Sequence, residues 1–381
     1  MKQIKLKGKD LFDGSHFLGP GKVLIMDENG VVTGIVAENA AGEDVRELDG
    51  ILCPGFINAH CHLELSHMKG AIPEKTGLPS FLTRVMEGRN NGHDQTDAIA
   101  AAEEAMWESG IAAVGDICNS PATIPQKRHQ RLYYHTFVEC MGFVDHAAPT
   151  RYNYSLEVLQ AFREISGPGH SASIVPHAPY SVSKTLFGLL AQTPHNTPLT
   201  IHNQECQAEN ELYNSKTGDF LRFFSHFGMD TSGFQAPGVN SLEAYLPYFS
   251  HNKILLVHNT YTSASDIRFA QQQPLEIWWC FCPQANLYIE DRLPDIPLFR
   301  EAGCNIALGT DSLASNHQLS VWEEIKTIRA HYPEIPLEEL LQWGTTNGAR
   351  ALGIESRYGS FREGTQPGVV LINNEESKRI I

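Results

Sequence analysis

The most constraining feature of this sequence is a regular alternation of short apolar runs with helical stretches between about residues 51 and 355. Eight runs have strand character: 51–57, 111–116, 132–138, 172–176, 198–201, 253–257, 276–281 and 305–308. After the first, residues 95–109 are Ala-rich with apolar residues at helical spacing, and this stretch ends at Gly110. Strands that alternate with helices are parallel, and eight of them predict an α/β chain with a closed (β/α)8 barrel, the TIM-barrel architecture.

The two ends of the chain have a different pattern. Residues 1 to about 50 alternate short apolar pieces with turn signals, such as Asp-Glu-Asn-Gly at 27–30, which indicates a hairpin. Residues 368–373 form one more strand-like run with no helix after it. We therefore expect residues 1–52 and 359–381 to form a small β-sandwich domain, and residues 53–358 to form the catalytic barrel.

Composition and charge limit the classes of partner. With 42% hydrophobic and 19% charged residues, the 381-residue chain is an ordinary globular protein that can bury a large core. Its formal net charge is −15 and no Lys/Arg block stands out, so neither nucleic acid nor an anionic membrane surface is an expected partner. We predict a small-molecule substrate and a homodimer, because dimers are the commonest assembly.

Targeting signals and cysteine usage indicate the compartment. Residues 1–5 lack the apolar core of a signal peptide, and no run approaches the roughly 20 apolar residues of a membrane span. The eight cysteines have no regular spacing and several lie in apolar runs, which indicates reduced thiols and not a disulfide framework. These features predict a cytoplasmic protein.

Polar residues end five of the eight apolar runs. They are His60 and His62 after the first run, His177 after the fourth, His202 with Glu205 after the fifth, His258 after the sixth and Asp311 after the eighth. Because His60 and His62 are spaced i, i+2, their imidazoles point the same way from one strand. Any one of these histidines alone could equally be a satisfied core residue. Five strand ends with the same feature indicate a site, since the C-terminal strand ends of a barrel carry its catalytic residues.

The motifs at these positions resemble those of the amidohydrolase superfamily, in its metal-dependent hydrolytic deaminase branch with adenosylhomocysteine, guanine, cytosine and aminofutalosine deaminases. The resemblance covers nearly the whole chain. It rests on Pro-Gly-Phe-Ile-Asn-Ala-His-Cys-His (54–62), His-x-x-Glu (202–205), Cys-Pro-Gln-Ala-Asn (282–286), Gly-Thr-Asp-Ser (309–312) and Asn-Gly-Ala-Arg-Ala-Leu-Gly (347–353). It implies that one divalent metal is bound by His60, His62, His202 and Asp311. It also implies that Glu205 is the proton shuttle, and that His258 orients the attacking water without being a full ligand.

The chemistry of these residue types is consistent with those roles. Three neutral imidazoles and one carboxylate leave an open position where bound water becomes acidic enough to supply hydroxide at ordinary pH. Asp311 can take the proton of that water. Glu205 can protonate a ring nitrogen beside the carbon under attack and later pass a proton to the departing ammonia. A nitrogen-rich donor set suits Zn or Fe(II), and the sequence does not choose between them.

An absent lysine favours one metal over two. Superfamily members that open cyclic amides use a carboxylated lysine on the fourth strand to bridge two metals, whereas residues 172–176 contain none and Lys184 is the nearest. A mononuclear centre with Glu205 beside it favours deamination over amide hydrolysis. His-Leu-Glu at 62–64 imitates a motif of the smaller zinc cytidine deaminases, but Cys280 and Cys282 lack the required P-C-x-x-C order and fit strand packing better.

Glu64 and His177 are the expected substrate contacts. Glu64 would accept hydrogen bonds from a ring N–H or from ribose hydroxyls, with a salt-bridged glutamate as an equal alternative; for His177 the alternative is a packing role. The segment His-Leu-Glu-Leu-Ser (62–66) resembles that of aminofutalosine deaminases of the alternative menaquinone route. The expected substrate is therefore 6-aminodeoxyfutalosine, an aminopurine nucleoside with a benzoate group. Lys69, Arg84 or Arg89 would meet that carboxylate from the first long loop.

Three other interpretations stay open. The same residues would deaminate guanine, adenosylhomocysteine, a pterin or a triazine. A cyclic amidase of the same superfamily would hold two metals per chain. A non-enzymatic relative that keeps the barrel for assembly would lack metal ligands, all of which are present here.

Overall fold

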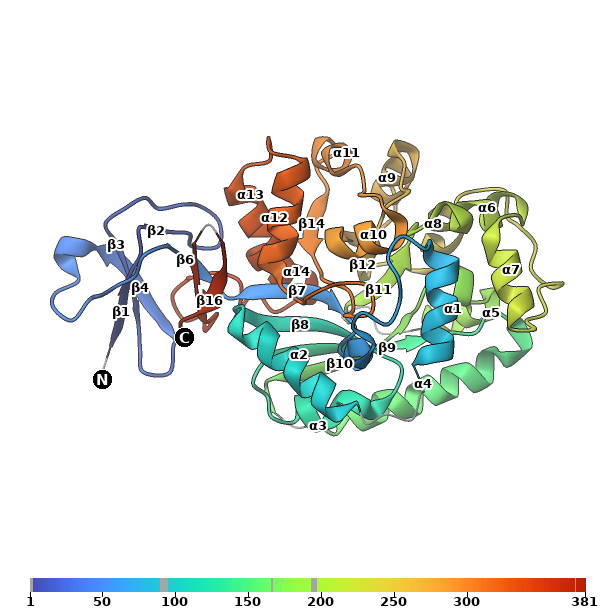
Figure 1. Cartoon of the computed structure of the whole chain (residues 1–381), viewed down its shortest axis with the longest axis horizontal. Helices are drawn as coiled ribbons and strands as arrows, with labels where there is room; N and C mark the ends of the chain where they lie inside the picture. Colours follow the sequence, from blue (N-terminus) through green and yellow to red (C-terminus); the bar gives the residue numbers. More distant parts are fainter. Residues whose placement is uncertain (1–2, 90–94, 166, 193–196, 374) are drawn as a thin grey trace.

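The structure is a computed structural model of the chain, and it describes residues 3–89, 95–165, 167–192, 197–373 and 375–381. Strands from both chain ends lie together on one side, and the alternating strands and helices of the middle lie on the other (Figure 1). The described residues form an α/β protein, as predicted. No helix among them is long and apolar enough to cross a membrane.

Eight parallel strands occupy the middle of the chain, in two four-stranded sheets of order β10-β9-β8-β7 and β11-β12-β13-β14. Their bounds are β7 (Phe56–Cys61), β8 (Ile111–Cys118), β9 (Tyr133–Cys140), β10 (His170–Pro176), β11 (Leu199–Asn203), β12 (Lys253–His258), β13 (Glu276–Phe281) and β14 (Asn305–Leu308). The seven runs predicted between 111 and 308 all coincide with strands, apart from terminal residues. All residues of β7 and β8 are buried, which explains their continuous rather than alternating apolar character.

The two central sheets meet near the C-terminal ends of their strands. The N–H of His202 donates to the carbonyl of His177 over an N···O distance of 2.9 Å. The N–H of Thr310 donates in the same way to the carbonyl of His60, also at 2.9 Å, and Cys61 forms an isolated parallel bridge with Asp311. These bonds bring the ends of β7, β10, β11 and β14 together.

The strand predicted over 51–57 was wrong in one respect, because it is two strands in different sheets. β6 (Ile51–Pro54) pairs antiparallel with β15 (Val369–Ile372), whereas β7 begins at Phe56 and pairs with β8. The break falls at Gly55, where a Cβ atom would lie 2.4 Å from the carbonyl oxygen of Pro367. Glycine fits this close approach of two backbones, so the chain can pass there from one sheet to the next.

Strands from the chain ends form two further four-stranded sheets. One, of order β4-β3-β1-β5, contains N-terminal strands alone, and the other, of order β16-β15-β6-β2, combines strands from both ends. Their remaining strands are β1 (Ile4–Lys7), β2 (Asp10–Leu11), β3 (Lys22–Met26), β4 (Val32–Ala37), β5 (Arg46–Glu47) and β16 (Ser377–Arg379). β3 and β4 pair antiparallel across the turn predicted at 27–30. Leu6 and Leu24 of one sheet share a buried apolar cluster with Leu52 and Val369 of the other.

Helices cover the central strands (Figure 1). They are α1 (Leu78–Gly88), α2 (Thr96–Glu108), α3 (Ile124–Lys127), α4 (Ala148–Arg163), α5 (Lys184–Leu190), α6 (Gln207–Ser215), α7 (Asp219–His226), α8 (Ser241–Tyr245), α9 (Ala264–Gln271), α10 (Pro283–Glu290), α11 (Ile296–Glu301), α12 (Val321–His331), α13 (Leu337–Gln342) and α14 (Gly348–Leu352). The helix predicted over 95–109 is α2. α1 lies in the long loop after β7, and its apolar face packs in one buried cluster with that of α7.

Candidate metal centre and active site

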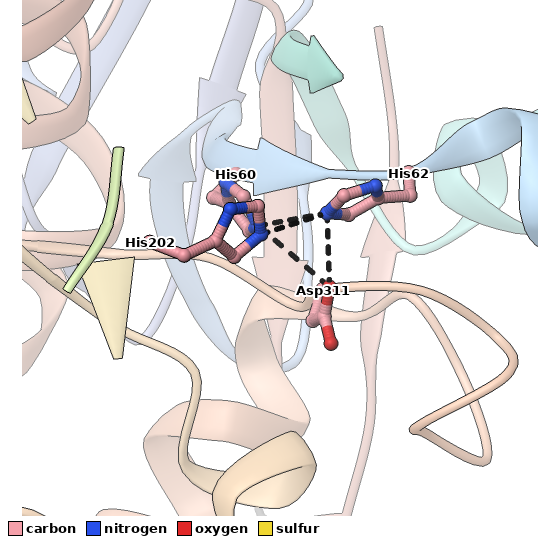
Figure 2. Close-up of side chains that lie close together, drawn as sticks. All are labelled: His60, His62, His202 and Asp311. Atoms are coloured by element: carbon pink, nitrogen blue, oxygen red, sulfur yellow. Dashed lines mark hydrogen bonds and ion pairs between the residues drawn. The ribbon is translucent and has the colours of Figure 1, made fainter. Parts of the chain in front are cut away.

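Four predicted site residues from three strand ends converge on one point (Figure 2). His60 and His62 come from the end of β7, His202 from β11 and Asp311 from just after β14. The Nε2 atom of His62 lies 3.2 Å from Nε2 of His60 and 3.2 Å from Nε2 of His202. Oδ1 of Asp311 lies 3.6 Å from Nε2 of His60 and 3.3 Å from Nε2 of His62. The four donor atoms lie within 4.8 Å of one another, and all four side chains are buried.

The hydrogen bonds of this cluster leave lone pairs pointing at its centre. Nδ1 of His202 lies 2.8 Å from the carbonyl oxygen of His177 and must donate to it, because a carbonyl only accepts. A neutral His202 therefore carries no proton on Nε2. The Nε2 atom of His62 holds at most one proton, yet it has two nitrogen neighbours and a carboxylate oxygen. A shared cation satisfies this arrangement, and three imidazoles with one carboxylate are a donor set that suits a divalent metal ion.

Burial and the Asp311 charge set the protonation states here. Burial lowers the pKa of His62 and of His202 well below the ordinary histidine value. Burial alone would raise the pKa of Asp311, but the hydrogen bond with His60 and the nearby His62 and His258 outweigh it and hold that pKa well below its usual range. Neutral imidazole and ionised carboxylate are the forms that ligate metals.

A second group of donor atoms, from Glu139, His177 and His202, also lies within 4.8 Å. It shares His202 with the first group. Nδ1 of His202, which is 3.3 Å from Oε1 of Glu139, already donates to the His177 carbonyl. β10 carries no lysine, and Lys184 is exposed at the start of α5. The site therefore accommodates one divalent metal ion, as predicted.

Glu205 and His258 lie beside the cluster, both buried, with 3.5 Å between Oε1 of Glu205 and Nε2 of His258. Nδ1 of His258 is 3.0 Å from Oδ1 of Asn286, whose amide group donates to Thr260 Oγ1 at 2.6 Å. Because the amide oxygen accepts, His258 carries its proton on Nδ1. Its Nε2 atom therefore presents a lone pair towards Glu205.

The two members of this pair have opposite pKa shifts. Burial, and then the Asp311 carboxylate, raise the pKa of Glu205 well above the ordinary value of a glutamate. Burial lowers the pKa of His258 to about 4. At neutral pH an uncharged imidazole thus faces a carboxyl group that keeps its proton to higher pH than usual. Such a pair can hold and move one proton.

The backbone bends sharply where site residues leave the strands. Gln204, His258 and Asp311 have φ angles of +45°, +73° and +56°, which are uncommon for residues with a Cβ atom. Such conformations cost about 1–3 kcal/mol each and concentrate at functional sites. Buried hydrogen bonds stabilise them; the N–H of Thr310, for example, donates to Oδ1 of Asn58 at 3.1 Å and holds the turn into Asp311.

A cavity of about 350 Å³ opens onto the cluster. One part of its lining is polar and comprises His62, His177, His202, Glu205, His258, Asp311 and Ser312. Much of the rest is apolar and comes from α1 and α7, with Phe81, Val85, Phe223 and Phe224 among the lining residues. Met86 of α1, which is 41% exposed, marks the solvent side of this apolar part.

The two predicted substrate contacts differ in position. His177 lines the cavity, its Nδ1 atom is 2.6 Å from Ser181 Oγ, and burial lowers its pKa to about 3. Glu64 is buried and is not among the lining residues. Its Oε1 atom accepts from Arg89 at 2.8 Å and its Oε2 atom accepts from Ser120 Oγ at 3.1 Å. Glu64 thus occupies the salt-bridged alternative, and its contact with a substrate stays a prediction.

Two arginines line the cavity. Of the three predicted cations, Arg89 is among the lining residues, whereas Lys69 and Arg84 are not. The Arg89 guanidinium is bound by Glu64 and, at 3.1 Å, by Oδ1 of Asn119. Arg151 of α4 also lines the cavity and was not predicted, because nothing in the sequence of a helix tells which charged residue faces a pocket.

Two further residues were missed although the strand-end rule could have found them. Glu139 comes near the end of β9, lines the cavity and faces His202. Asp116 comes near the end of β8, where its carboxylate accepts from the N–H of Leu63. Asn286 belongs to the 282–286 motif, but no local pattern indicates its contact with His258, because Asn286 lies in α10 and His258 ends β12.

Comparisons with known proteins identify the family of the chain. Residues 51–380 match the family model described as Amidohydrolase family. Adenosine deaminase of Helicobacter pylori is 28% identical over 327 residues, which are 81% of this chain and 76% of that protein. Aminodeoxyfutalosine deaminase of Nitratiruptor sp. is 25% identical over 346 residues, which are 89% of this chain and 82% of that protein.

Solved structures share the fold. Helicobacter pylori aminofutalosine deaminase in complex with methylthio-coformycin has a TM-score of 0.82 at 22% identity, with 97% of this chain and 93% of that chain covered. Guanine deaminase of C. acetobutylicum with bound guanine has a TM-score of 0.74 at 17% identity, with 98% and 91% covered. The chain therefore has the α/β TIM-barrel fold of these enzymes.

Proposed function

Because the chain belongs to the amidohydrolase family, we propose that it is a metal-dependent hydrolytic deaminase that releases ammonia from a heteroaromatic amine. Such an enzyme is a hydrolase of carbon–nitrogen bonds other than peptide bonds, acting on a cyclic amidine. One observation carries the proposal: three imidazoles and a carboxylate surround one point, and a proton-holding pair lies beside it. The curated relatives that are named as deaminases support it.

In this proposal His60, His62, His202 and Asp311 hold the metal. A bound divalent metal supplies Lewis acidity and makes water nucleophilic at neutral pH. The hydrogen bond from His202 to the His177 carbonyl fixes the tautomer that leaves Nε2 free. Asp311, ionised because its histidine neighbours lower its pKa, accepts a proton from the attacking water.

Glu205 transfers protons to the substrate, and His258 orients the attacking water. The carboxyl group of Glu205 donates its proton to a ring nitrogen beside the amino-bearing carbon, which makes that carbon a better electrophile. His258 accepts a hydrogen bond at Nε2 and orients the attacking water, since Asn286 keeps its proton on Nδ1. Glu205, now ionised, takes up the remaining hydroxyl proton on that carbon and passes it to the leaving amine, which departs as ammonia. The proton accepted by Asp311 then returns to Glu205 and restores its carboxyl group.

The substrate that fits best is an aminopurine nucleoside, and we name 6-aminodeoxyfutalosine, which would place the enzyme in menaquinone biosynthesis. An extended apolar lining from α1 and α7 suits a nucleoside that carries an aromatic group. Arg89 and Arg151 supply positive charge for its carboxylate. Ser181 Oγ donates to the carbonyl of Ala178 at 3.0 Å and therefore accepts from Nδ1 of His177, so His177 has its lone pair on Nε2.

Substitution of the arginines tests this substrate. Arg89→Met and Arg151→Met should raise KM for the benzoate-bearing nucleoside by about tenfold or more, since a hydrogen bond to a charged group contributes about 1.5–3 kcal/mol. Both variants should change KM for adenosine little. Lys69→Met, off the cavity lining, is the control. Equal losses on both nucleosides would refute the carboxylate contact.

A screen for ammonia release tests the activity itself. Protein loaded with Zn or Fe(II) is offered aminopurine nucleosides, guanine, adenosylhomocysteine, pterins and triazines. We expect release from an aminopurine nucleoside and one metal per chain. Opening of a cyclic amide, with no ammonia from any heteroaromatic amine, would refute deamination and favour the cyclic amidase alternative.

We propose five finer features as well, which concern the barrel, the terminal domain, the metal, the compartment and the oligomeric state. The two central sheets close one (β/α)8 barrel over residues 53–358, supported by the hydrogen bonds at both of their edges. Residues 1–52 and 359–381 form a β-sandwich domain, supported by the apolar cluster that their two sheets share. The metal is Zn or Fe(II), which elemental analysis tests. The enzyme is a cytoplasmic homodimer, and light scattering tests the dimer.

A further inference from the structure

A fully buried ion pair lies behind the metal cluster. Lys127 at the end of α3 is 1% exposed and Asp116 of β8 is 0% exposed, with 2.5 Å between Nζ of Lys127 and Oδ2 of Asp116. The ammonium group also donates to Thr136 Oγ1 at 2.8 Å and to Cys118 Sγ at 3.3 Å. All three of its N–H bonds therefore have acceptors, and the lysine is held in one position.

The other oxygen of this carboxylate reaches the metal-ligand segment. Oδ1 of Asp116 accepts from the backbone N–H of Leu63 at 2.8 Å. Leu63 begins the 3-10 helix η2 (Leu63–Met68) and directly follows His62. An anion at the first N–H of a helical turn is electrostatically favourable, and the bond is charge-assisted. Lys127, Asp116 and one peptide unit thus connect α3 to the backbone that carries His62.

Stability alone does not account for such a pair. Burial of two charges costs free energy that their attraction offsets only in part, and apolar replacements of buried ion pairs are often neutral or stabilising. A direct role in substrate binding is also absent, because neither Lys127 nor Asp116 is among the residues that line the cavity. The direct hydrogen bond between the pair and the metal-ligand segment is the one from the N–H of Leu63 to Asp116.

We propose that Asp116 and Lys127 are positioning residues for the metal centre: Lys127 holds the Asp116 carboxylate, which fixes the peptide after His62 and thereby the His62 imidazole. His62 is the ligand most sensitive to such a shift. Its Nε2 atom is 3.2 Å from two other nitrogens and 3.3 Å from the Asp311 carboxylate, so a small displacement changes three donor separations at once. The inference rests on the proposed assignment of His62 as a metal ligand.

Two double variants test the proposal. Asp116→Ala/Lys127→Met removes the acceptor of the Leu63 N–H, whereas Asp116→Asn/Lys127→Met keeps a neutral one. Both remove the two charges together, so neither leaves an unpaired buried charge. The Kd for Zn²⁺ is measured with metal-free protein by competition with a chromophoric chelator. We expect the alanine variant to raise Kd by about tenfold or more, and the asparagine variant to raise it by only about threefold, because a neutral acceptor is the weaker one.

Tyr134→Phe is the matched control. It removes the buried hydrogen bond between the Tyr134 hydroxyl and Oε2 of Glu103, 2.7 Å long, in the same packed region, without removing any contact of Asp116. Even if Tyr134→Phe lowers the Tm of the metal-free protein as much as the double variants do, it should bind Zn²⁺ with the Kd of the wild type. The positioning role would be overturned if the two double variants had the same Kd for Zn²⁺. It would also be overturned if Tyr134→Phe weakened Zn²⁺ binding as much as the alanine double variant does.

The remaining outcomes also test the positioning role or the proposed metal centre. If the alanine variant does not fold, the asparagine variant is compared with the wild type, and a wild-type Kd for Zn²⁺ there would overturn the role of the charged pair. Wild-type protein that does not bind Zn²⁺ at all would refute the proposed metal centre. If the wild type binds Zn²⁺ and both double variants bind it with the same Kd, the positioning role alone is refuted.

Discussion

Replacement of Glu205 by glutamine separates the proposed proton donor from the metal centre. Glu205 is not one of the four clustered donors, and its carboxyl group lies 3.5 Å from Nε2 of His258. Because burial and then Asp311 raise its pKa well above the ordinary glutamate value, the native group keeps its proton to higher pH than an exposed glutamate does. An amide has nearly the same shape and no charge, so Glu205→Gln should fold and bind metal like the wild type.

The expected loss lies in catalysis. An amide cannot transfer a proton to a ring nitrogen, and positioned general acid–base catalysis contributes about 10²–10⁴-fold. The transition state should therefore lose about 3–5 kcal/mol, at 1.36 kcal/mol for each factor of ten. KM should change little, since the amide still occupies the same volume of the cavity wall. Burst-free steady-state assays of ammonia release, with metal content measured on the same samples, give both quantities.

The neighbouring Glu209 provides a control. It is a buried glutamate of α6 whose pKa burial raises to about 7, and its Oε1 atom accepts from the N–H of Gln204 at 2.9 Å, but it does not line the cavity. Glu209→Gln should keep kcat within about threefold of the wild type, because Glu209 moves no proton in the reaction and the amide oxygen of glutamine still accepts from the N–H of Gln204. A Glu205→Gln enzyme that retains more than a tenth of wild-type kcat, or that loses its metal, would contradict the assigned role.

Three further predictions concern stability, measured by urea unfolding. Removal of the metal by a chelator should lower the free energy of unfolding by about 2.7 kcal/mol relative to protein in free Zn²⁺ at about 100 times its Kd. A urea midpoint that does not depend on Zn²⁺ would exclude a metal site in the native state. Asn58→Ala should cost about 1–3 kcal/mol, because it removes two buried hydrogen bonds, one from the N–H of Thr310 to Asn58 Oδ1 and one from the Asn58 amide group to Thr310 Oγ1; an unchanged midpoint would refute this. Burial lowers the pKa of His135 to about 3, so below its unfolded value of about 6.5 only the unfolded state takes up the proton. This linkage should remove about 2 kcal/mol between pH 7 and pH 5, and His135→Phe should abolish that contribution.

The central strands could be predicted from sequence because their signal is local. Parallel strands between helices are buried on both faces, and their apolar runs, such as 276–281, stand out without knowledge of partners. The same holds for the strand-end histidines, since a polar residue that stops an apolar run is visible in one dimension. The break at Gly55 was not visible, because the backbone it approaches, at Pro367, lies at the other end of the chain.

Residues that act through a partner were the ones missed. Arg89 was predicted as a cation that meets the substrate carboxylate, but its salt bridge with Glu64 was not predicted. Asn286 and Asp116 act on His258 and on the N–H of Leu63, and these contacts join loops and strands that are separated in sequence. Sequence spacing predicts which residues share a strand end, whereas hydrogen bonds between different elements depend on how those elements are arranged in space.

β11 and the turn after it contribute residues to both the metal cluster and the proton-holding pair. His202 of β11 belongs to the metal cluster, and Glu205 from the turn after it belongs to the proton-holding pair. The left-handed backbone at Gln204, with φ of +45°, lies between them, and the buried N–H of Gln204 donates to Glu209. A rigid turn fixes the distance between nucleophile and acid far better than two separate loops would, and misplacement of about 1 Å can cost about 100-fold in rate. The spacing of His202 and Glu205 is therefore the feature of the sequence that best distinguishes deamination from simple metal binding.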